Sequence, residues 1–315
     1  MTERRLDPGE IERAEQRLLG TVLRTPLVAM GPVLLKAENL QPGGSFKLRG
    51  ALNTLLQLHP DQLQRGVVAH SSGNHAIAVA LASTMVGTRA TVVMPNDAPR
   101  MKLDTAAALG AQVVVVGPDS SERAARATAI ASAEGRALVE PYDSFEVLAA
   151  TATIGREIVE DTPDTDLTVF VPISGGGLAG GVATAVKLAR PDARVVGVEP
   201  ELAADALASW RAGERVELPA DEMSRTCADG LRVRVVGELT WPHLRAHLDD
   251  IITVSEAQIH DAMRRIAFEA HLVAEPSGAV AAAGASTWPG VGVGTVVAVV
   301  SGGNVDASML QRAFA

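Results

Sequence analysis

Residues 168–198 read TVFVPISGGGLAGGVATAVKLARPDARVVGV, in which two apolar runs flank a glycine-rich turn and an alanine-rich segment. This pattern predicts a strand over 168–173, a loop over 174–177, a helix over 178–188 and a strand over 194–198. Two strands joined through a helix pair in parallel, because the helix carries the chain back along one face of the sheet. The segment therefore predicts a parallel sheet covered by helices.

The same alternation continues along most of the chain. We expect further strands over 33–37, 66–69, 90–94, 113–116, 137–139 and 295–300, and helices over 75–85, 100–109, 121–134, 145–159, 256–270 and 277–285. A length of 315 residues predicts about two domains. We therefore predict an α/β fold in which each domain is a mostly parallel twisted sheet flanked by helices.

Charge and composition exclude several classes of partner. The net charge is −9 and no basic residues cluster, so we expect neither nucleic acid nor an acidic membrane surface as a partner. No uninterrupted apolar run reaches about 18 residues, so we expect no membrane span. The single cysteine, Cys227, excludes an intramolecular disulfide and fits a reducing compartment. With a charged N-terminus that lacks the apolar core of a signal peptide, the chain is expected to be a soluble cytoplasmic enzyme.

Lys47 is one of only four lysines, although the chain holds 28 lysines and arginines together. It follows two glycines and Phe46 in the run GGSFKLRG over 43–50. A lysine amine forms a Schiff base once it loses its proton, whereas an arginine side chain does not. Taken alone, Lys47 is more typical of a solvated loop, and it is the glycine and serine clusters farther along the chain that favour a reactive amine.

The first of these clusters follows the strand predicted over 168–173. Consecutive glycines allow backbone N–H groups to point into one concavity, and the following helix adds its positive N-terminal end. No lysine follows at the spacing of a nucleoside triphosphate loop, so a bound monophosphate fits better. The candidate phosphate-binding residues are Ser174, Gly175, Gly176, Gly177 and Leu178.

Two further polar clusters stand where predicted strands end. The run 71–75 precedes a helix, so its hydroxyls and free amides can bind a carboxylate. The run 301–304 ends the last apolar strand, and a hydroxyl there can bond a ring nitrogen without protonating it. The residues concerned are Ser71, Ser72, Asn74, His75 and Ser301. Helix capping or a plain turn would also explain either cluster taken alone.

A candidate cation site follows the strand predicted over 194–198. Glu199 and Asp205 lie six residues apart with Ala203 between them. Two carboxylates and the backbone carbonyl of Ala203 would form a hard oxygen site suited to Mg²⁺ or Ca²⁺, with water completing the shell. Solvated surface acids are the alternative interpretation.

An amine, a phosphate site, a carboxylate site and a hydroxyl for a heteroaromatic nitrogen together describe pyridoxal 5′-phosphate with an amino acid. The chain resembles the fold-type II pyridoxal-phosphate enzymes of the serine/threonine dehydratase and serine racemase family. The resemblance runs from Arg24 to Asn304. It rests on the motifs RTPL at 24–27, KAE at 36–38, SFK at 45–47, SGNH at 72–75, GVEP at 197–200, ADG at 228–230, EPSG at 275–278 and SGGN at 301–304.

The resemblance implies a role for each candidate. Lys47 would form the Schiff base with the cofactor aldehyde and then take the substrate α-proton, while Phe46 lines the pocket. Asn74 would bond the ring hydroxyl oxygen and Ser301 the pyridine nitrogen. The run 174–178 would hold the phosphate. Ser71, Ser72 and His75 would surround the substrate carboxylate.

Two residues bear on which family member the chain is most similar to. In serine racemases, a serine at the position of Ser72 carries a proton on the cofactor face opposite the lysine, although bacterial dehydratases carry it too. Arg123 matches an arginine that racemases place near a second substrate carboxylate, a position that favours 3-hydroxyaspartate. An ordinary exposed helix arginine is the alternative. The metal-dependent relatives resemble the spacing of Glu199 and Asp205.

The resemblance also implies a domain plan and an activity. A large cofactor-binding domain would span 1–66 and 143–315, and a small mobile substrate-binding domain would span 67–142, as in tryptophan synthase β-like enzymes. The favoured reaction is dehydration and deamination of L-threonine or L-serine to 2-oxobutyrate or pyruvate and ammonia. Serine racemase with side elimination and 3-hydroxyaspartate dehydratase are the alternatives. Relatives are usually homodimers.

Three places in the chain depart from the family pattern. Relatives often have Gln-Gly-Thr where this chain has Thr-Ala-Thr at 151–153, glutamine at the position of Ile77, and phenylalanine or asparagine at the position of Tyr142. These changes put the identity of the substrate in doubt, but not that of the cofactor.

Overall fold

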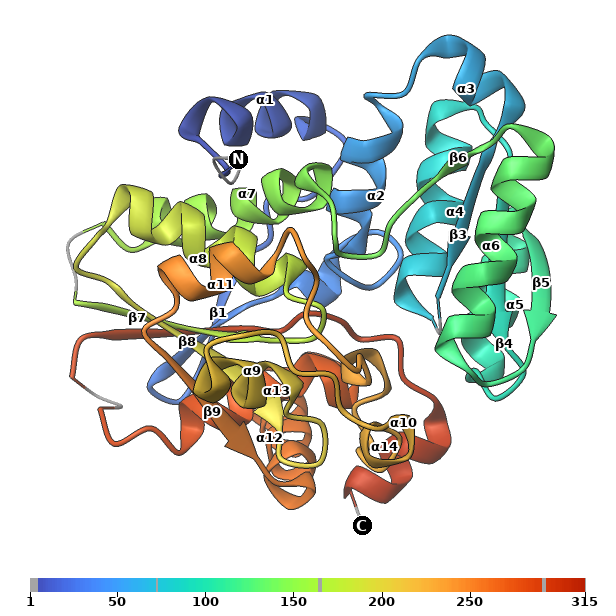
Figure 1. The fold of residues 1–315 in the computed structure, drawn as a ribbon. Helices are drawn as coiled ribbons and strands as arrows, with labels where there is room; N and C mark the ends of the chain where they lie inside the picture. The colour runs from blue at the N-terminus through green and yellow to red at the C-terminus, as the bar shows by residue number, and fades with distance from the viewer. Residues whose placement is uncertain (1–4, 72, 164–165, 291–292, 315) are drawn as a thin grey trace.

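The computed structural model describes residues 5–71, 73–163, 166–290 and 293–314, and its strands form two sheets (Figure 1). The larger sheet has six strands in the order β1-β2-β10-β7-β8-β9. These are β1 (Leu27–Met30), β2 (Val33–Lys36), β10 (Thr295–Val299), β7 (Leu167–Pro172), β8 (Arg194–Pro200) and β9 (Asp250–Val254). All neighbours are parallel except the edge pair of β1 and β2.

The smaller sheet has four parallel strands in the order β5-β4-β3-β6. They are β5 (Gln112–Val116), β4 (Ala90–Pro95), β3 (Val67–His70) and β6 (Ala137–Leu138). All four fall within the range 67–142 that the sequence assigns to a small domain. The domain bounds themselves stay a prediction.

Helices flank both sheets, as the alternating sequence pattern predicts (Figure 1). Early in the chain they are α1 (Pro8–Leu18), η1 (Glu38–Leu40), α2 (Lys47–Leu55), α3 (Pro60–Arg65), α4 (Asn74–Val86), α5 (Arg100–Ala108), α6 (Ser120–Glu134) and α7 (Phe145–Asp161). Later they are α8 (Gly177–Ala189), α9 (Asp205–Ala212), α10 (Ala220–Met223), η2 (Asp229–Leu231), α11 (Trp241–His247), α12 (Glu256–Glu269), α13 (Pro276–Ser286) and α14 (Ala307–Phe314). The predicted α/β fold is confirmed.

The larger sheet is buried on both faces because successive residues of a strand point to opposite sides. In β10, Val296 and Ala298 pack with α12 and α13, whereas Val297 and Val299 pack on the opposite face with α8. This two-sided burial explains the unbroken apolar run that the sequence shows there.

Helix α2, which begins at Lys47, packs against α4, a helix that flanks the smaller sheet, although α2 precedes that sheet in the chain. Leu48 and Leu52 share a buried apolar cluster with Val67 of β3 and Val79 of α4. Gly50 lies against Val147 of α7, so α2 also contacts a helix of the larger unit. The larger and smaller units are the larger and smaller sheets, each taken with the helices that flank it. The candidate lysine therefore stands where the two units meet.

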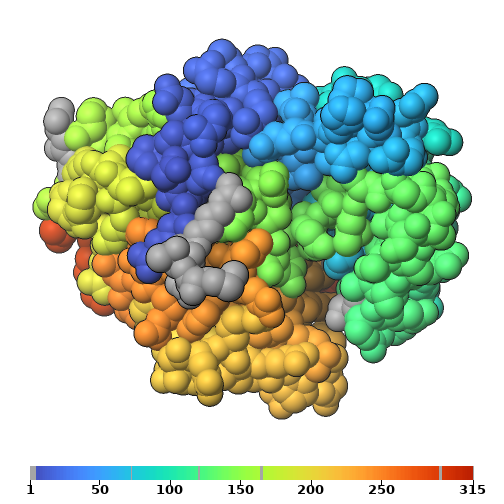
Figure 2. All heavy atoms as spheres, turned by 45° about the horizontal axis from the view of Figure 1, so that its top comes forward, coloured from blue at the N-terminus to red at the C-terminus, as the bar shows by residue number. Residues whose placement is uncertain are grey.

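The space-filling view places segments from distant parts of the chain on one face. In Figure 2 the blue N-terminal segments cover the upper part, the green segment around α6 fills the right side, and yellow and orange C-terminal segments lie below.

Candidate active site

Lys47 is held by the loop that follows β10. The amide of Phe46 donates to the carbonyl of Ser301 at 3.1 Å, and that of Gly303 donates to Gly44 at 2.9 Å. Ser45 and Gly302 add an antiparallel bridge. Two motifs that stand at opposite ends of the sequence thus form one structure.

The amine of Lys47 has an environment unlike that of the other lysines. Its Nζ donates to the carbonyl of Pro141 at 2.6 Å and lies 5.0 Å from the centre of the Phe46 ring. Loss of solvation lowers the pKa of Lys47 to about 8. The other three lysines, Lys36, Lys102 and Lys187, each pair with a carboxylate. The environment of Lys47 therefore favours a neutral amine.

The glycine-rich run 174–178 forms the predicted strand-to-helix junction before α8. Gly176 has φ 90°, a left-handed conformation that favours glycine. A Cβ atom at Gly175 would overlap the ring of Tyr142, and one at Gly177 would lie 2.8 Å from the Tyr142 carbonyl. Leu178 is buried in the core beneath. Gly175 and Gly177 are thus required by the close approach of Tyr142, and Gly176 by its left-handed backbone.

The run 71–75 lies partly outside the described residues, because Ser72 is not described. Ser71 donates its amide to Val93 at 3.0 Å, and its hydroxyl accepts from the amide of Gly73 at 2.9 Å. Helix α4 then begins at Asn74. The structure brings this polar turn to the carboxyl end of β3, where ligands of parallel sheets bind.

His75 is buried, and its Nε2 lies 3.0 Å from the carbonyl of Val139. Burial, followed by the charge of Lys47, lowers the pKa of His75 to about 3, so its imidazole is neutral. This ring supports the chain after β6, and its predicted role at the substrate carboxylate stays a prediction.

Ser174 and Ser301 are joined by a short relay of hydrogen bonds. Ser174 Oγ donates to the carbonyl of Gly230 at 3.1 Å, and the amide of Gly230 donates to Ser277 Oγ at 2.9 Å. Ser301 Oγ donates to the carbonyl of Ser277 at 3.4 Å. The phosphate candidate and the ring-nitrogen candidate therefore lie in one connected region.

Arg123 lies on α6, beside the smaller sheet. Its Nη1 donates to the carbonyl of Pro118 at 2.7 Å, while its Nε is buried and has no hydrogen-bond partner among the described residues. Burial lowers the pKa of Arg123, and the charge of Arg123 adds to burial in lowering the pKa of His70. His70 directly precedes Ser71, so Arg123 lies on the side of the substrate-binding candidates.

Comparison with known proteins identifies the family of the chain. A family model described as "Pyridoxal-phosphate dependent enzyme" matches residues 18–302. The chain belongs to the pyridoxal-phosphate-dependent enzyme family. It is 40% identical to L-threonine ammonia-lyase of Thermotoga maritima over 96% of this chain and 77% of that one, and 35% identical to L-threo-3-hydroxyaspartate ammonia-lyase of Saccharomyces cerevisiae over 95% and 93%. The structure of maize serine racemase matches with a TM-score of 0.90 and 35% identity, covering 98% and 96%.

The residues present fit the cofactor of this family. The Lys47 amine has a lowered pKa, and Ser301 offers a hydroxyl rather than a carboxylate. At 175–177 glycines expose only backbone, because a side chain at any of these positions would collide with Tyr142 or Thr240. Asn74 is turned toward its neighbours, since its Nδ2 donates to Glu275 and its Oδ1 accepts from Asn304 at 2.9 Å.

An ion network beside Asn74 was missed by sequence reasoning. Lys102 of α5 reaches Asp229 at 2.7 Å and Glu275 at 3.0 Å, both in the larger unit. Burial alone would lower the pKa of Lys102, but the charges of Glu275 and Asp229 raise it. The sequence offered one signal, because Lys102 is one of four lysines and both acids lie in motifs shared with the family.

Glu199 and Asp205 lie together, as the cation prediction requires. The amides of Ala206 and Leu207 donate to Glu199 at 3.1 and 2.8 Å, and both Asp205 oxygens are buried beside the Glu199 carboxylate, with which Asp205 forms a side-chain hydrogen bond when one of the two is protonated. Burial raises the pKa of Asp205 to about 8, and burial with the Asp205 charge raises that of Glu199. No group of three or more His, Cys, Asp or Glu side chains within the described ranges is arranged to hold a metal.

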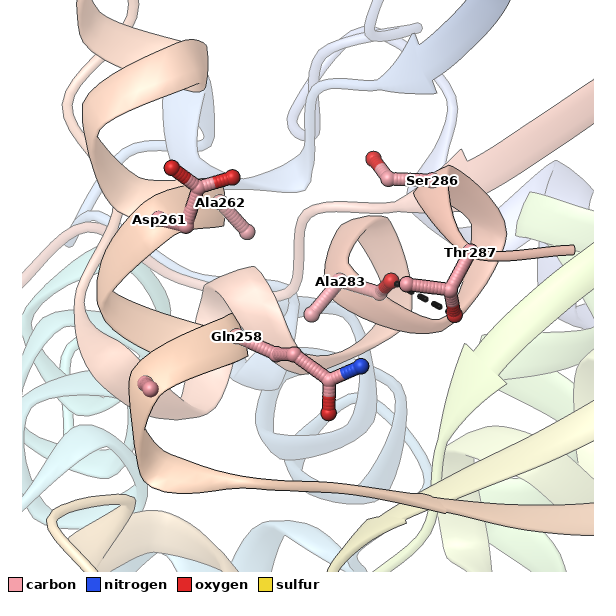
Figure 3. A pocket seen from close by; sticks show the side chains of 7 residues that line it. Gln258, Asp261, Ala262, Ala283, Ser286 and Thr287 are labelled. Carbon is pink, nitrogen blue, oxygen red and sulfur yellow. Dashed lines mark hydrogen bonds between the residues drawn. The ribbon is translucent and has the colours of Figure 1, made fainter.

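A pocket of about 250 Å³ opens between α12 and α13, away from this site (Figure 3). It is lined by Gln258, Asp261, Ala262, Ala283, Ser286 and Thr287 together with Ala257. No residue predicted for the active site lines it.

None of the helices in the described part of the chain combines the length and apolar character needed to cross a bilayer.

Proposed function

We propose that this chain is a pyridoxal-phosphate-dependent ammonia-lyase. It would convert L-threonine to 2-oxobutyrate and ammonia, or L-serine to pyruvate and ammonia. The observation that carries the proposal is the Lys47 amine, whose pKa is lowered to about 8 and which lies between Pro141 and the Phe46 ring. The likeness to L-threonine ammonia-lyase of Thermotoga maritima supports the choice of reaction.

Each part of the site has a task in this reaction. The bound cofactor would supply the electron sink for the pair left when the α-proton departs. Lys47 would anchor the cofactor and take that proton as a neutral amine. The amides of 174–178 would hold the phosphate. Ser301, a neutral hydroxyl, would contact the ring nitrogen without fixing a positive charge there, a setting that favours prompt loss of the β-hydroxyl.

The substrate would bind between Lys47 and the turn before α4. We propose that Ser71, Ser72 and His75 surround its carboxylate, with Ser72 able to carry a proton on the other face. After water leaves, the released enamine becomes an imine, and a second water hydrolyses it to the oxo acid and ammonia. A reversible transfer through Ser72 would instead give racemisation, as the likeness to maize serine racemase allows.

One observation favours a second candidate, the dehydration of 3-hydroxyaspartate. Arg123 is half-buried, and its buried Nε has no hydrogen-bond partner among the described residues, so this free donor suits a carboxylate. The yeast relative named for this substrate is 35% identical. Arg123 would then bind the second carboxylate of the substrate.

The test is a substrate panel on the purified holoenzyme. L-threonine, L-serine and L-threo-3-hydroxyaspartate are supplied separately, and oxo acid, ammonia and D-amino acid are measured. We expect oxo acid and ammonia in equal amounts, most from L-threonine or L-serine. D-serine accumulating faster than pyruvate would overturn the proposal, and strong preference for 3-hydroxyaspartate would favour the second candidate.

We further propose how the two units move during this reaction and how the protein assembles. The unit 67–142 would move as a body and close over the substrate, since it carries the run 71–75 and Arg123. The protein would act as a cytoplasmic homodimer, in keeping with its family.

A divalent cation, Mg²⁺ or Ca²⁺, would bind Glu199, Asp205 and the Ala203 carbonyl. Without it, the raised pKa of Asp205 means that stability is lost as pH rises from the ordinary carboxyl range toward about 8. We expect Mg²⁺ to raise the melting temperature more at about pH 9 than at about pH 6, because the Asp205 carboxylate, whose pKa is raised to about 8, is ionised at the higher pH. Asp205→Asn is the control and should remove most of the gain. An equal gain in the variant would place the ion elsewhere.

A further inference from the structure

The side chain of Asp143 holds a distant segment of backbone. Its carboxylate accepts three consecutive amides, from Glu238 at 2.9 Å, Leu239 at 2.9 Å and Thr240 at 3.2 Å. Asp143 lies in the connection between β6 and α7, and the segment 238–240 directly precedes α11. A Cβ atom at Gly237 would overlap the Asp143 carboxylate, so the fit is close.

The segment 237–240 in turn holds the glycine-rich loop. The amide of Gly237 and the hydroxyl of Thr240 both donate to the carbonyl of Gly175, at 3.1 and 2.6 Å. In a planar trans peptide the N–H points opposite to the C=O. Fixing the Gly175 carbonyl toward 237–240 therefore directs the Gly176 N–H the other way, out of that contact. A Cβ at Gly176 would lie only 2.6 Å from Thr240 Oγ1.

We infer that Asp143 is a positioning residue for the cofactor phosphate, acting through 237–240 on the peptide between Gly175 and Gly176. The inference rests on the proposed function and deepens it, since it assigns a residue that shapes the phosphate site without touching the phosphate. Three N–H donors spread the charge of the carboxylate, which limits its repulsion of a nearby phosphate.

The same short segment also contacts Lys47. Pro141 accepts the hydrogen bond of Lys47 Nζ, and the Tyr142 ring lies against Gly175. Residues 141–143 therefore touch both the amine that would hold the cofactor aldehyde and the loop that would hold its phosphate. A substitution of Asp143 would alter the site for the cofactor phosphate. It would not remove the Pro141 carbonyl that accepts from Lys47, because that carbonyl belongs to the backbone.

The test compares two ligands that differ only in the phosphate. Apo protein is titrated with pyridoxal 5′-phosphate and with pyridoxal, and Kd is measured for wild type, Asp143→Ala and Asp143→Asn. We expect Asp143→Ala to raise the Kd of pyridoxal 5′-phosphate about tenfold, and that of pyridoxal by less than about twofold. Asp143→Asn, which keeps an oxygen acceptor, should show a smaller effect of the same kind. Ser255→Ala, which removes the side-chain cap of α12, is the matched control and should change neither Kd.

An equal rise in the Kd of both ligands would show that Asp143 supports the fold in general. No rise in either Kd would show that the glycine-rich loop keeps its shape without Asp143. Either result overturns the inference. If Asp143→Ala fails to fold, Asp143→Asn decides the question by the same ratio of the two Kd values. Wild-type protein that binds pyridoxal 5′-phosphate without using Lys47 would instead count against the proposed function.

Discussion

Lys47→Ala is expected to lower oxo-acid formation by about 10³-fold or more, because it removes both the anchor of the cofactor and the base that takes the α-proton. The purified variant should also lose the visible absorbance of the bound cofactor. Turnover of L-threonine and the absorbance spectrum of the dialysed protein measure the two effects.

Lys187→Ala is the matched control for this change. Lys187 pairs with Asp249 at 2.8 Å on the far end of α8, and a partly exposed pair contributes about 0–1 kcal/mol. We expect this control to keep both spectrum and turnover. A Lys47→Ala protein that kept the absorbance would show that another group holds the cofactor.

Arg49→Met should produce the largest loss of stability among these changes. Arg49 is buried and pairs with Glu38 at 2.8 Å and with Glu157 at 2.7 Å. Methionine has similar reach but no charge, so two buried carboxylates each lose a charged partner, while Glu157 keeps its pair with Lys36 at 2.6 Å. We expect the free energy of unfolding to fall by about 3–5 kcal/mol, measured by chemical denaturation.

Arg24→Met tests whether burial is the reason for the large loss of stability expected for Arg49→Met. Arg24 also contacts two acids, Glu160 at 2.8 Å and Asp161 at 2.7 Å, but its side chain is 48% exposed. We expect a loss of about 1 kcal/mol or less. Comparable losses in the two variants would show that the buried network around Arg49 is not what stabilises α2.

The regular elements could be predicted because their causes are local. The apolar runs at 168–173 and 194–198 became β7 and β8, and the glycine turn between them preceded α8. Helix α2 was not predicted as a helix, since its sequence of Lys47–Leu55 follows a loop and carries a central glycine. Its stability comes from packing on α4 and α7, which a local pattern does not record.

The candidate site could be predicted residue by residue but not as a network. Each cluster carried its own chemistry, so Lys47, the glycine loop and Ser301 were found separately. The ion pairs of Lys102 join residues 127 and 173 positions apart, and Asp143 holds amides 95 to 97 positions away. Such contacts depend on how the two units pack, which no spacing in the sequence encodes.

Reduction of the holoenzyme with borohydride, followed by peptide mapping, tests the central claim most directly. Borohydride makes the bond between a lysine amine and the cofactor aldehyde permanent, so the modified residue can be read by mass spectrometry. The account predicts a pyridoxyl group on the peptide that contains Lys47. A pyridoxyl group found only on Lys36, Lys102 or Lys187, or on none of the lysines, would contradict it.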